Sequence, residues 1–104
     1  MGNSNKFISK IFKALSDTDR LEILNLLRDE EKCVCDIARN FGIRQPLVSR
    51  HLKILKNCGL VKQREEGTRR FYSVTDPIIF ELIDSVTLDL VNALSKRAIE
   101  QITA

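Results

Sequence analysis

This 104-residue chain has three cysteines and a single histidine, the residue types that bind soft metals or undergo thiol chemistry. Cys33 and Cys35 are separated by one residue, whereas Cys58 and His51 stand apart from them in the sequence. Residues two apart on an α-helix point about 200° away from each other, so an intact helix keeps these two thiols from holding one ion. We therefore predict that ion binding by Cys33 and Cys35 competes with the first turn of a helix at this position.

The same cysteine pair has two other interpretations. Free cysteines often pack as small buried hydrophobic residues, and two close thiols also serve as a reversible redox switch. The residue types alone do not separate metal binding from oxidation, so both stay open. Cys58 is the only other thiol of the chain, and whether it completes the site also stays open.

Basic residues concentrate in one stretch of the chain. Between Arg44 and Arg70 there are eight Lys or Arg residues and two Glu, a net charge of +6 in a chain whose total is +3. Concentrated positive charge of this kind indicates a polyanionic partner, most simply nucleic acid.

The hydrophobic spacing predicts the elements that carry these residues. Residues 34–57 have the pattern of two short helices joined around Gly42, which is typical of a helix-turn-helix. Residues 60–74 alternate as two strands about a turn at 65–68, which predicts a basic hairpin, or wing. Amphipathic helices are expected at 6–15 and 19–28, the second capped by Asp19, and one long helix from 76 to about 101.

This order predicts a mostly α fold with a small β-hairpin. It is a winged helix-turn-helix of about five helices and a two-stranded wing, in a single domain over residues 1–104. The first and last helical segments, 1–16 and 76–104, carry wide apolar stripes that so short a chain has little core to bury. We expect these two segments to form a homodimer.

The outward face of the second helix of the motif has the side chains that read DNA bases. Gln pairs with adenine and Arg with guanine in the major groove, so Gln45, Ser49 and Arg50 are the predicted base contacts. Lys53, Arg69 and Arg70 are predicted phosphate contacts, because phosphate contact depends on position and not on base identity.

Residues 14–74 resemble the ArsR family of metal- and metalloid-responsive repressors. The matching runs are Ala14–Asp17, Arg20–Leu24, Cys33–Ile37, Gln45–Leu52, Cys58–Val61 and Arg64–Gly67 before Tyr72. The chain departs from the family pattern at Thr18, where Pro is common, and at Arg44, where Ser is frequent.

The resemblance implies a specific inducer chemistry. A Cys-Val-Cys run at this place marks the branch that senses arsenite, antimonite or soft divalent metals through thiolates, which makes Cys33 and Cys35 the expected ligands. A third cysteine often follows two residues later, and here that position is Ile37. The His ligands of the zinc-sensing relatives are absent, since residues 76–104 contain no His. The resemblance places His51 in the DNA-binding helix, as a packing or phosphate-contacting residue.

Other classes of protein are disfavoured. The sequence has no Gly-rich phosphate loop and no Ser-His-Asp arrangement, so an enzyme is not expected. It has no apolar run near the roughly 20 residues of a membrane span and no signal peptide, so a cytoplasmic protein without a membrane partner is expected.

The predicted function is that of a homodimeric transcriptional repressor that binds double-stranded operator DNA and needs no obligatory cofactor. Its release follows binding of As(III), Sb(III) or a soft divalent metal. The alternatives are a redox-sensing or ligand-independent winged-helix regulator, or a winged helix used only for protein interaction.

Overall fold

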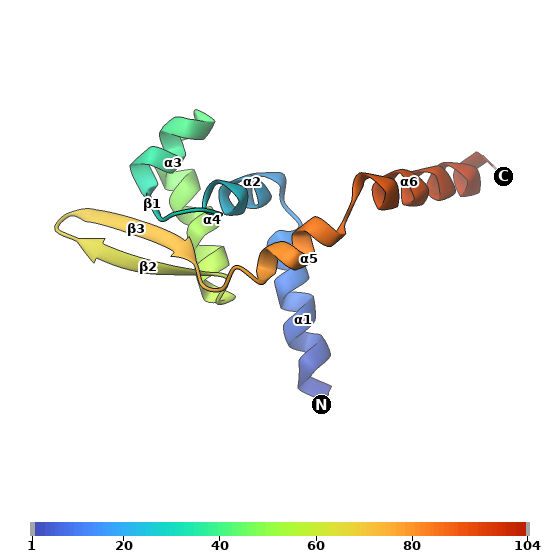
Figure 1. Cartoon of the computed structure of the whole chain (residues 1–104), viewed down its shortest axis with the longest axis horizontal. Helices are drawn as coiled ribbons and strands as arrows, with labels where there is room; N and C mark the ends of the chain where they lie inside the picture. The colour runs from blue at the N-terminus through green and yellow to red at the C-terminus, as the bar shows by residue number, and fades with distance from the viewer. Residues whose placement is uncertain (1, 104) are drawn as a thin grey trace.

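The helices and strands follow one another in the order expected for a winged helix-turn-helix. The computed structural model describes residues 2–103, with side chains from residue 4 onward. Helices α3 and α4 form the helix-turn-helix, and strands β2 and β3 form the wing beside them (Figure 1). The elements are α1 (Gly2–Leu15), α2 (Thr18–Leu26), β1 (Lys32–Cys33), α3 (Val34–Phe41), α4 (Gln45–Asn57), β2 (Val61–Glu66), β3 (Arg69–Val74), α5 (Ile79–Ser85) and α6 (Leu88–Thr103).

The predicted fold class is confirmed, with two corrections in the number of elements. The described residues form six helices where about five were expected, and three strands where two were expected. The additional strand is β1, which pairs antiparallel with β3 through Lys32 opposite Tyr72 and Cys33 opposite Phe71. Two residues of an edge strand have no alternating pattern of their own, so no hydrophobic pattern predicted this strand.

The core lies where α2, α3 and α4 meet. Helix α4 packs on both α2 and α3 through aliphatic residues at helical spacing, and the wing and α5 add Tyr72 and Phe80. The largest fully buried side chains are those of Ile23, Leu24, Ile37, Val48, Leu52, Leu55 and Cys33. This packing fixes α4 against the rest of the fold and leaves its opposite face in solvent.

The start of α2 differs from the sequence prediction. Asp17, not Asp19, is the N-cap: its backbone is extended, and Oδ1 accepts a 3.2 Å hydrogen bond from the backbone N–H of Arg20. Asp19 lies inside the first turn, where its charge favours the helix dipole. Two Asp residues two positions apart offer the same capping chemistry, and the turn after α1 decides between them.

We expect Asp17→Ala to lower the free energy of unfolding by about 1 kcal/mol, the usual effect of removing a helix cap. The Arg20 N–H bond is the largest cause that holds the pKa of the Asp17 carboxyl below its ordinary value of 3.8. A depressed folded-state pKa means that this stabilisation is present above the unfolded pKa and is lost as the pH falls through the folded one. Urea unfolding at pH 7 and below pH ~4 measures it. A loss in Asp19→Ala as large as that in Asp17→Ala would contradict the assignment.

The C-terminal segment is two helices and not the single long helix expected. Val86 leaves the helical conformation, with φ −83° and ψ 79°, and Thr87 Oγ1 then accepts a hydrogen bond of 3.2 Å from the Leu90 N–H at the start of α6. Helix α5 packs on the core through Phe80, whereas no residue of α6 is buried. Figure 1 shows α6 extending away from the other elements, and α1 projecting in another direction. Over residues 2–103, no helix is long and apolar enough to cross a membrane.

Candidate DNA-binding face and thiol site

The exposed face of α4 carries the residues predicted to read DNA. Pro46 occupies the first turn of the helix, and Arg44 precedes it without a side-chain cap bond. Val48, Leu52 and Leu55 point into the core, so the helical period turns the intervening side chains outward. Gln45, Arg50 and Lys53 are exposed and Ser49 is half-buried.

A cleft joins this helix to the wing. Gln63 lines this cleft, and its Oε1 accepts hydrogen bonds from Lys56 Nζ at 3.1 Å and from Tyr72 Oη at 3.0 Å. These bonds fix the wing strands against the C-terminal half of α4. The cleft is lined by Ser49, Lys53, Lys56, Asn57, Gln63, Arg70 and Tyr72. It therefore brings together three residues of the predicted DNA-binding set, and Lys56 and Gln63 belong to the same surface although the sequence did not single them out.

Arg69 lies on the opposite face of the wing. Neighbouring residues of a strand point to opposite sides, so Arg70 faces the cleft while Arg69 faces away from it. Nη2 of Arg69 donates to Cys33 Sγ at 3.3 Å and approaches Cys35 Sγ at 4.0 Å, and the guanidinium lies 5.3 Å from the Phe71 ring centre. The structure thus separates Arg69 from the other predicted phosphate contacts and places it at the cysteines.

His51 is also apart from the exposed set. It belongs to α4 but is buried, with 8% of its surface exposed. Its Nδ1 lies 3.4 Å from Arg20 Nη1, and its Nε2 lies 3.7 Å from Asp19 Oδ2. Asp17 is close as well, but the Arg20 guanidinium already contacts His51 and, at 3.7 Å, Asp17. The Arg20 guanidinium is therefore the positive group of this cluster, and His51 packs α4 against α2.

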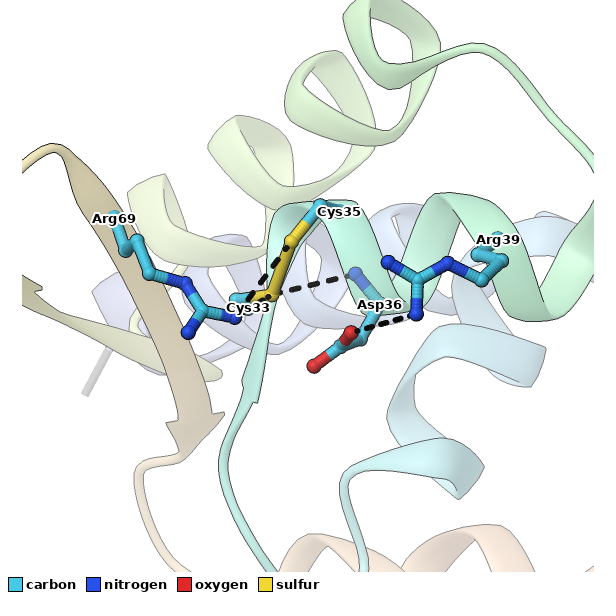
Figure 2. Close-up of a disulfide and its surroundings, with 5 residues drawn as sticks. All are labelled: Cys33, Cys35, Asp36, Arg39 and Arg69. Atoms are coloured by element: carbon cyan, nitrogen blue, oxygen red, sulfur yellow. Dashed lines mark hydrogen bonds and ion pairs between the residues drawn. A yellow bond between two sulfur atoms is a disulfide. The ribbon is translucent and has the colours of Figure 1, made fainter.

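Cys33 and Cys35 meet at the N-terminus of α3. Cys33 is the N-cap, with extended backbone, and its Sγ accepts a hydrogen bond of 3.3 Å from the Asp36 N–H. The two Cα atoms are 5.4 Å apart, and the structure joins the two Sγ atoms as a disulfide (Figure 2). The two sulfurs were expected to meet only where the first turn is extended or unwound, and the structure has this extended backbone at Cys33 without any unwinding of α3. Cys33 stands one residue before the helix, so the helical angle does not apply to it.

The pair has a third donor beside it. A carboxylate oxygen of Asp36 lies within 4.8 Å of both sulfurs, and the same carboxylate pairs with Arg39 at 3.4 Å. Cys33 is buried and Cys35 is half-buried, so solvent reaches the pair from the Cys35 side. In the reduced form, two thiolates and one carboxylate are a donor set that suits soft and borderline ions. Asp36 directly follows Cys-Val-Cys in the sequence, and the sequence reasoning missed it as a donor.

Cys58 does not join this group. It ends α4, where its thiol lies 4.0 Å from the carbonyl oxygen of Lys10 in α1. Within the part of the chain that the structure describes, no donor cluster includes it. The cysteine pair, Asp36 and Arg69 therefore make up the thiol site of one chain.

Charges flank the thiol site on the wing side. The Arg64 guanidinium bonds to Glu31 and to Glu66, and it lies 4.7 Å from the Phe71 ring centre. The bond from Arg64 to Glu31 lowers the pKa of the Glu31 carboxyl. Arg64 thereby ties the loop before β1 to the wing, next to the cysteines.

Comparisons with known proteins agree with this geometry. Residues 17–63 match the family model of bacterial regulatory proteins, arsR family. The chain is 38% identical over 96 residues to an arsenical resistance operon repressor of Staphylococcus aureus, covering 92% of this chain and 90% of that one. It is 40% identical to a Staphylococcus aureus homolog of a cadmium resistance regulatory protein, over 78% of this chain and 68% of that one.

A solved structure extends the likeness to the whole fold. The homodimeric winged helix-turn-helix DNA-binding domain of a possible ArsR-family regulator from Mycobacterium bovis is 31% identical, with a TM-score of 0.73. The match covers 96% of this chain and 88% of that domain.

Proposed function

Because this chain belongs to the ArsR family of transcriptional repressors, which bind DNA and are not enzymes, we propose that a soft metal or metalloid ion releases it from its operator by binding Cys33 and Cys35. The observation that supports this most is the meeting of the two sulfurs and the Asp36 carboxylate at the start of α3. Helix α3 packs on α4, so the site is one helix away from the DNA-binding face. We also propose that the repressor acts in the cytoplasm, where its operator DNA is found.

The proposed DNA contacts come from α4 and the wing. Helix α4 enters the major groove with Gln45, Ser49 and Arg50 at the bases, as recognition helices do. Lys53 and Arg70 contact phosphates on either side of the cleft. His51 is left out of this contact set, since its side chain is buried against α2.

The proposed assembly is a homodimer built by α1 and α6. Both helices keep large apolar side chains in solvent, which a second copy would cover. These side chains are Phe7, Ile8 and Phe12 on α1, and Leu88, Leu90, Val91, Leu94, Ile99 and Ile102 on α6. A two-fold dimer of winged helices predicts an imperfect palindrome with half-sites about 10 bp apart.

A release titration tests the inducer. The reduced protein is bound to a duplex selected from a random-sequence pool and titrated in parallel with arsenite, Cd(II), Zn(II) and diamide. We expect arsenite or Cd(II) to release DNA at a stoichiometry of one ion per chain. Operator binding that is insensitive to every ion would contradict the proposed function.

The disulfide favours a second candidate, a redox-sensing repressor. Oxidation of the two thiols forms the S–S bond and passes two electrons and two protons to an oxidant such as diamide. The same titration separates the candidates. A redox sensor releases DNA only with diamide and rebinds it after a dithiol reductant is added.

Arg50 and Arg70 have different expected roles on DNA. We expect Arg50→Ala to weaken binding to the selected duplex by about 1–3 kcal/mol and binding to random DNA far less, because it loses a base contact. Arg70→Ala should weaken both similarly and reduce the slope of log affinity against log salt by about one per chain. The wild-type slope for about 6–10 phosphate contacts is roughly −5 to −9. Fluorescence anisotropy over a salt series measures both quantities. An equal loss on both duplexes in Arg50→Ala would show that Arg50 reads no base.

A further inference from the structure

We propose that Arg69 is a positioning residue that links the thiol site to the wing, so that ion binding at the sulfurs weakens DNA binding through the wing. The inference rests on the proposed function, because it takes Cys33 and Cys35 as the inducer site. It assigns Arg69 a role different from the phosphate contact predicted from sequence.

The first support is the direction of the side chain. Arg69 comes from the first residue of β3, directly after the wing tip at Gly67 and Thr68. Figure 2 shows it reaching from the wing strand to the two sulfurs at the start of α3. Its Nη2 donates to Cys33 Sγ at 3.3 Å across a separation of 36 residues. The contact therefore joins the outer end of the wing to the N-terminus of α3.

The second support is the charge around Arg69. Glu66 lies opposite Arg69 in the hairpin register, but its carboxylate accepts from Arg64 at 2.9 Å instead. Among the side chains that the structure describes, no carboxylate lies within 4.0 Å of the Arg69 guanidinium. The sulfurs, which the structure joins as a disulfide, are thus its hydrogen-bond acceptors. In the reduced protein the same bond would run from guanidinium to thiolate, and such a bond is charge-assisted and stronger than a neutral one.

An ion on the sulfurs weakens this link. Each thiolate shares a lone pair with the ion, and the positive charge of the ion offsets the negative charge of the sulfurs, so the charge-assisted bond from Arg69 becomes weaker. The start of β3 is then held less firmly, by its pairing with β2 and by the contact of Arg69 with the Phe71 ring. Arg70 is the next residue of that strand and faces the DNA-binding cleft, so its placement over a phosphate becomes less firm as well. Coupling is reciprocal, so DNA that orders the wing also weakens ion binding.

A thermodynamic cycle with matched variants tests the link. Arg69→Met keeps the aliphatic length and removes the charge and donors, and Arg70→Met makes the same change on the other face of the strand. The dissociation constant for the selected duplex is measured with and without Cd(II). Cd(II) occupancy is followed separately by the ultraviolet thiolate-to-metal absorption.

We expect Cd(II) to raise the wild-type dissociation constant by roughly 5–150-fold, the usual range of such coupling. In Arg69→Met this ratio should fall to within about threefold of unity while Cd(II) still binds one per chain. Arg70→Met should weaken binding without Cd(II) and should also lower this ratio, because the phosphate contact that the ion disturbs is already missing. If Arg69→Met keeps the wild-type ratio and loses affinity as Arg70→Met does, the inference is overturned. Arg69 would then be a phosphate contact, as the sequence predicted.

Amide hydrogen exchange of the reduced, DNA-free protein separates a failure of the link from a failure of the proposed function. We expect exchange over residues 67–71 to be several-fold faster in Arg69→Met than in wild type and in Arg70→Met. If no ion releases the wild type from DNA, the proposed function fails while faster exchange still supports the link. Equal exchange in all three proteins overturns the link, whatever the ions do.

Discussion

Replacing both Cys33 and Cys35 with serine is expected to abolish release by arsenite or Cd(II) while the variant still binds its operator. Serine keeps the size of the side chain, and a serine at position 33 caps α3 as the Cys33 sulfur does, by accepting from the Asp36 N–H. A serine hydroxyl is protonated and hard, so it does not replace a thiolate for a soft ion. The variant should therefore lose the whole response to the inducer, which in the wild type is a fall in operator affinity of roughly 5–150-fold.

Cys58→Ser is the matched control for this experiment. Its thiol lies at the Lys10 carbonyl of α1 and outside the donor cluster, so we expect its release curve to follow the wild type. The two dissociation constants, with and without ion, are measured by anisotropy for each variant. Continued release of the double variant by arsenite or Cd(II) would show that the sensing site lies elsewhere.

Val91→Asp is expected to break the dimer and to lower operator affinity by roughly 10²-fold or more. A subunit bound at one half-site then no longer holds a second subunit near the other half-site. Val91 belongs to the apolar stripe of α6, and the variant would bury an unpaired carboxylate in each half of the proposed interface. Sedimentation velocity should show a monomer, with anisotropy reporting the loss of DNA binding.

Asn92→Asp adds the same charge at the neighbouring position, on the polar side of α6 next to Asp89 and Lys96 in the helical period. We expect it to stay dimeric and to keep its operator affinity. A Val91→Asp protein with dimer mass and wild-type affinity would place the interface outside α6.

Local pattern was enough to predict the DNA-binding unit. The spacing of Val34, Ile37, Ala38 and Phe41 places one face of α3 in the core, and Gly42, at φ +64°, ends the helix as predicted. The spacing of Val48, Leu52 and Leu55 in turn determines which residues of α4 face outward. A helix or a hairpin is set by residues a few positions apart, so its pattern can be read along the chain.

Where two local signals compete, the sequence did not decide. Asp17 and Asp19 are equally good caps for α2, and the path of the chain after α1 selects Asp17. The apolar run from α5 to α6 is continuous enough for one helix, yet the chain bends at Val86 and Thr87. Packing of Phe80 on the core holds α5, while α6 leaves it.

The sequence by itself determined the family, the fold class, the cysteine pair and the exposed face of α4, because each depends on residue types at short spacing. Only the tertiary structure decided what surrounds the cysteines. Pairing of β1 with β3 brings the wing to Cys33, and the pleat of β3 then turns Arg69 to the sulfurs and Arg70 to the cleft. Strand register fixes which side chains meet, and a shift by one residue would exchange the two arginines. Register between segments more than 30 residues apart is set by the packing of the whole fold, which no short pattern contains.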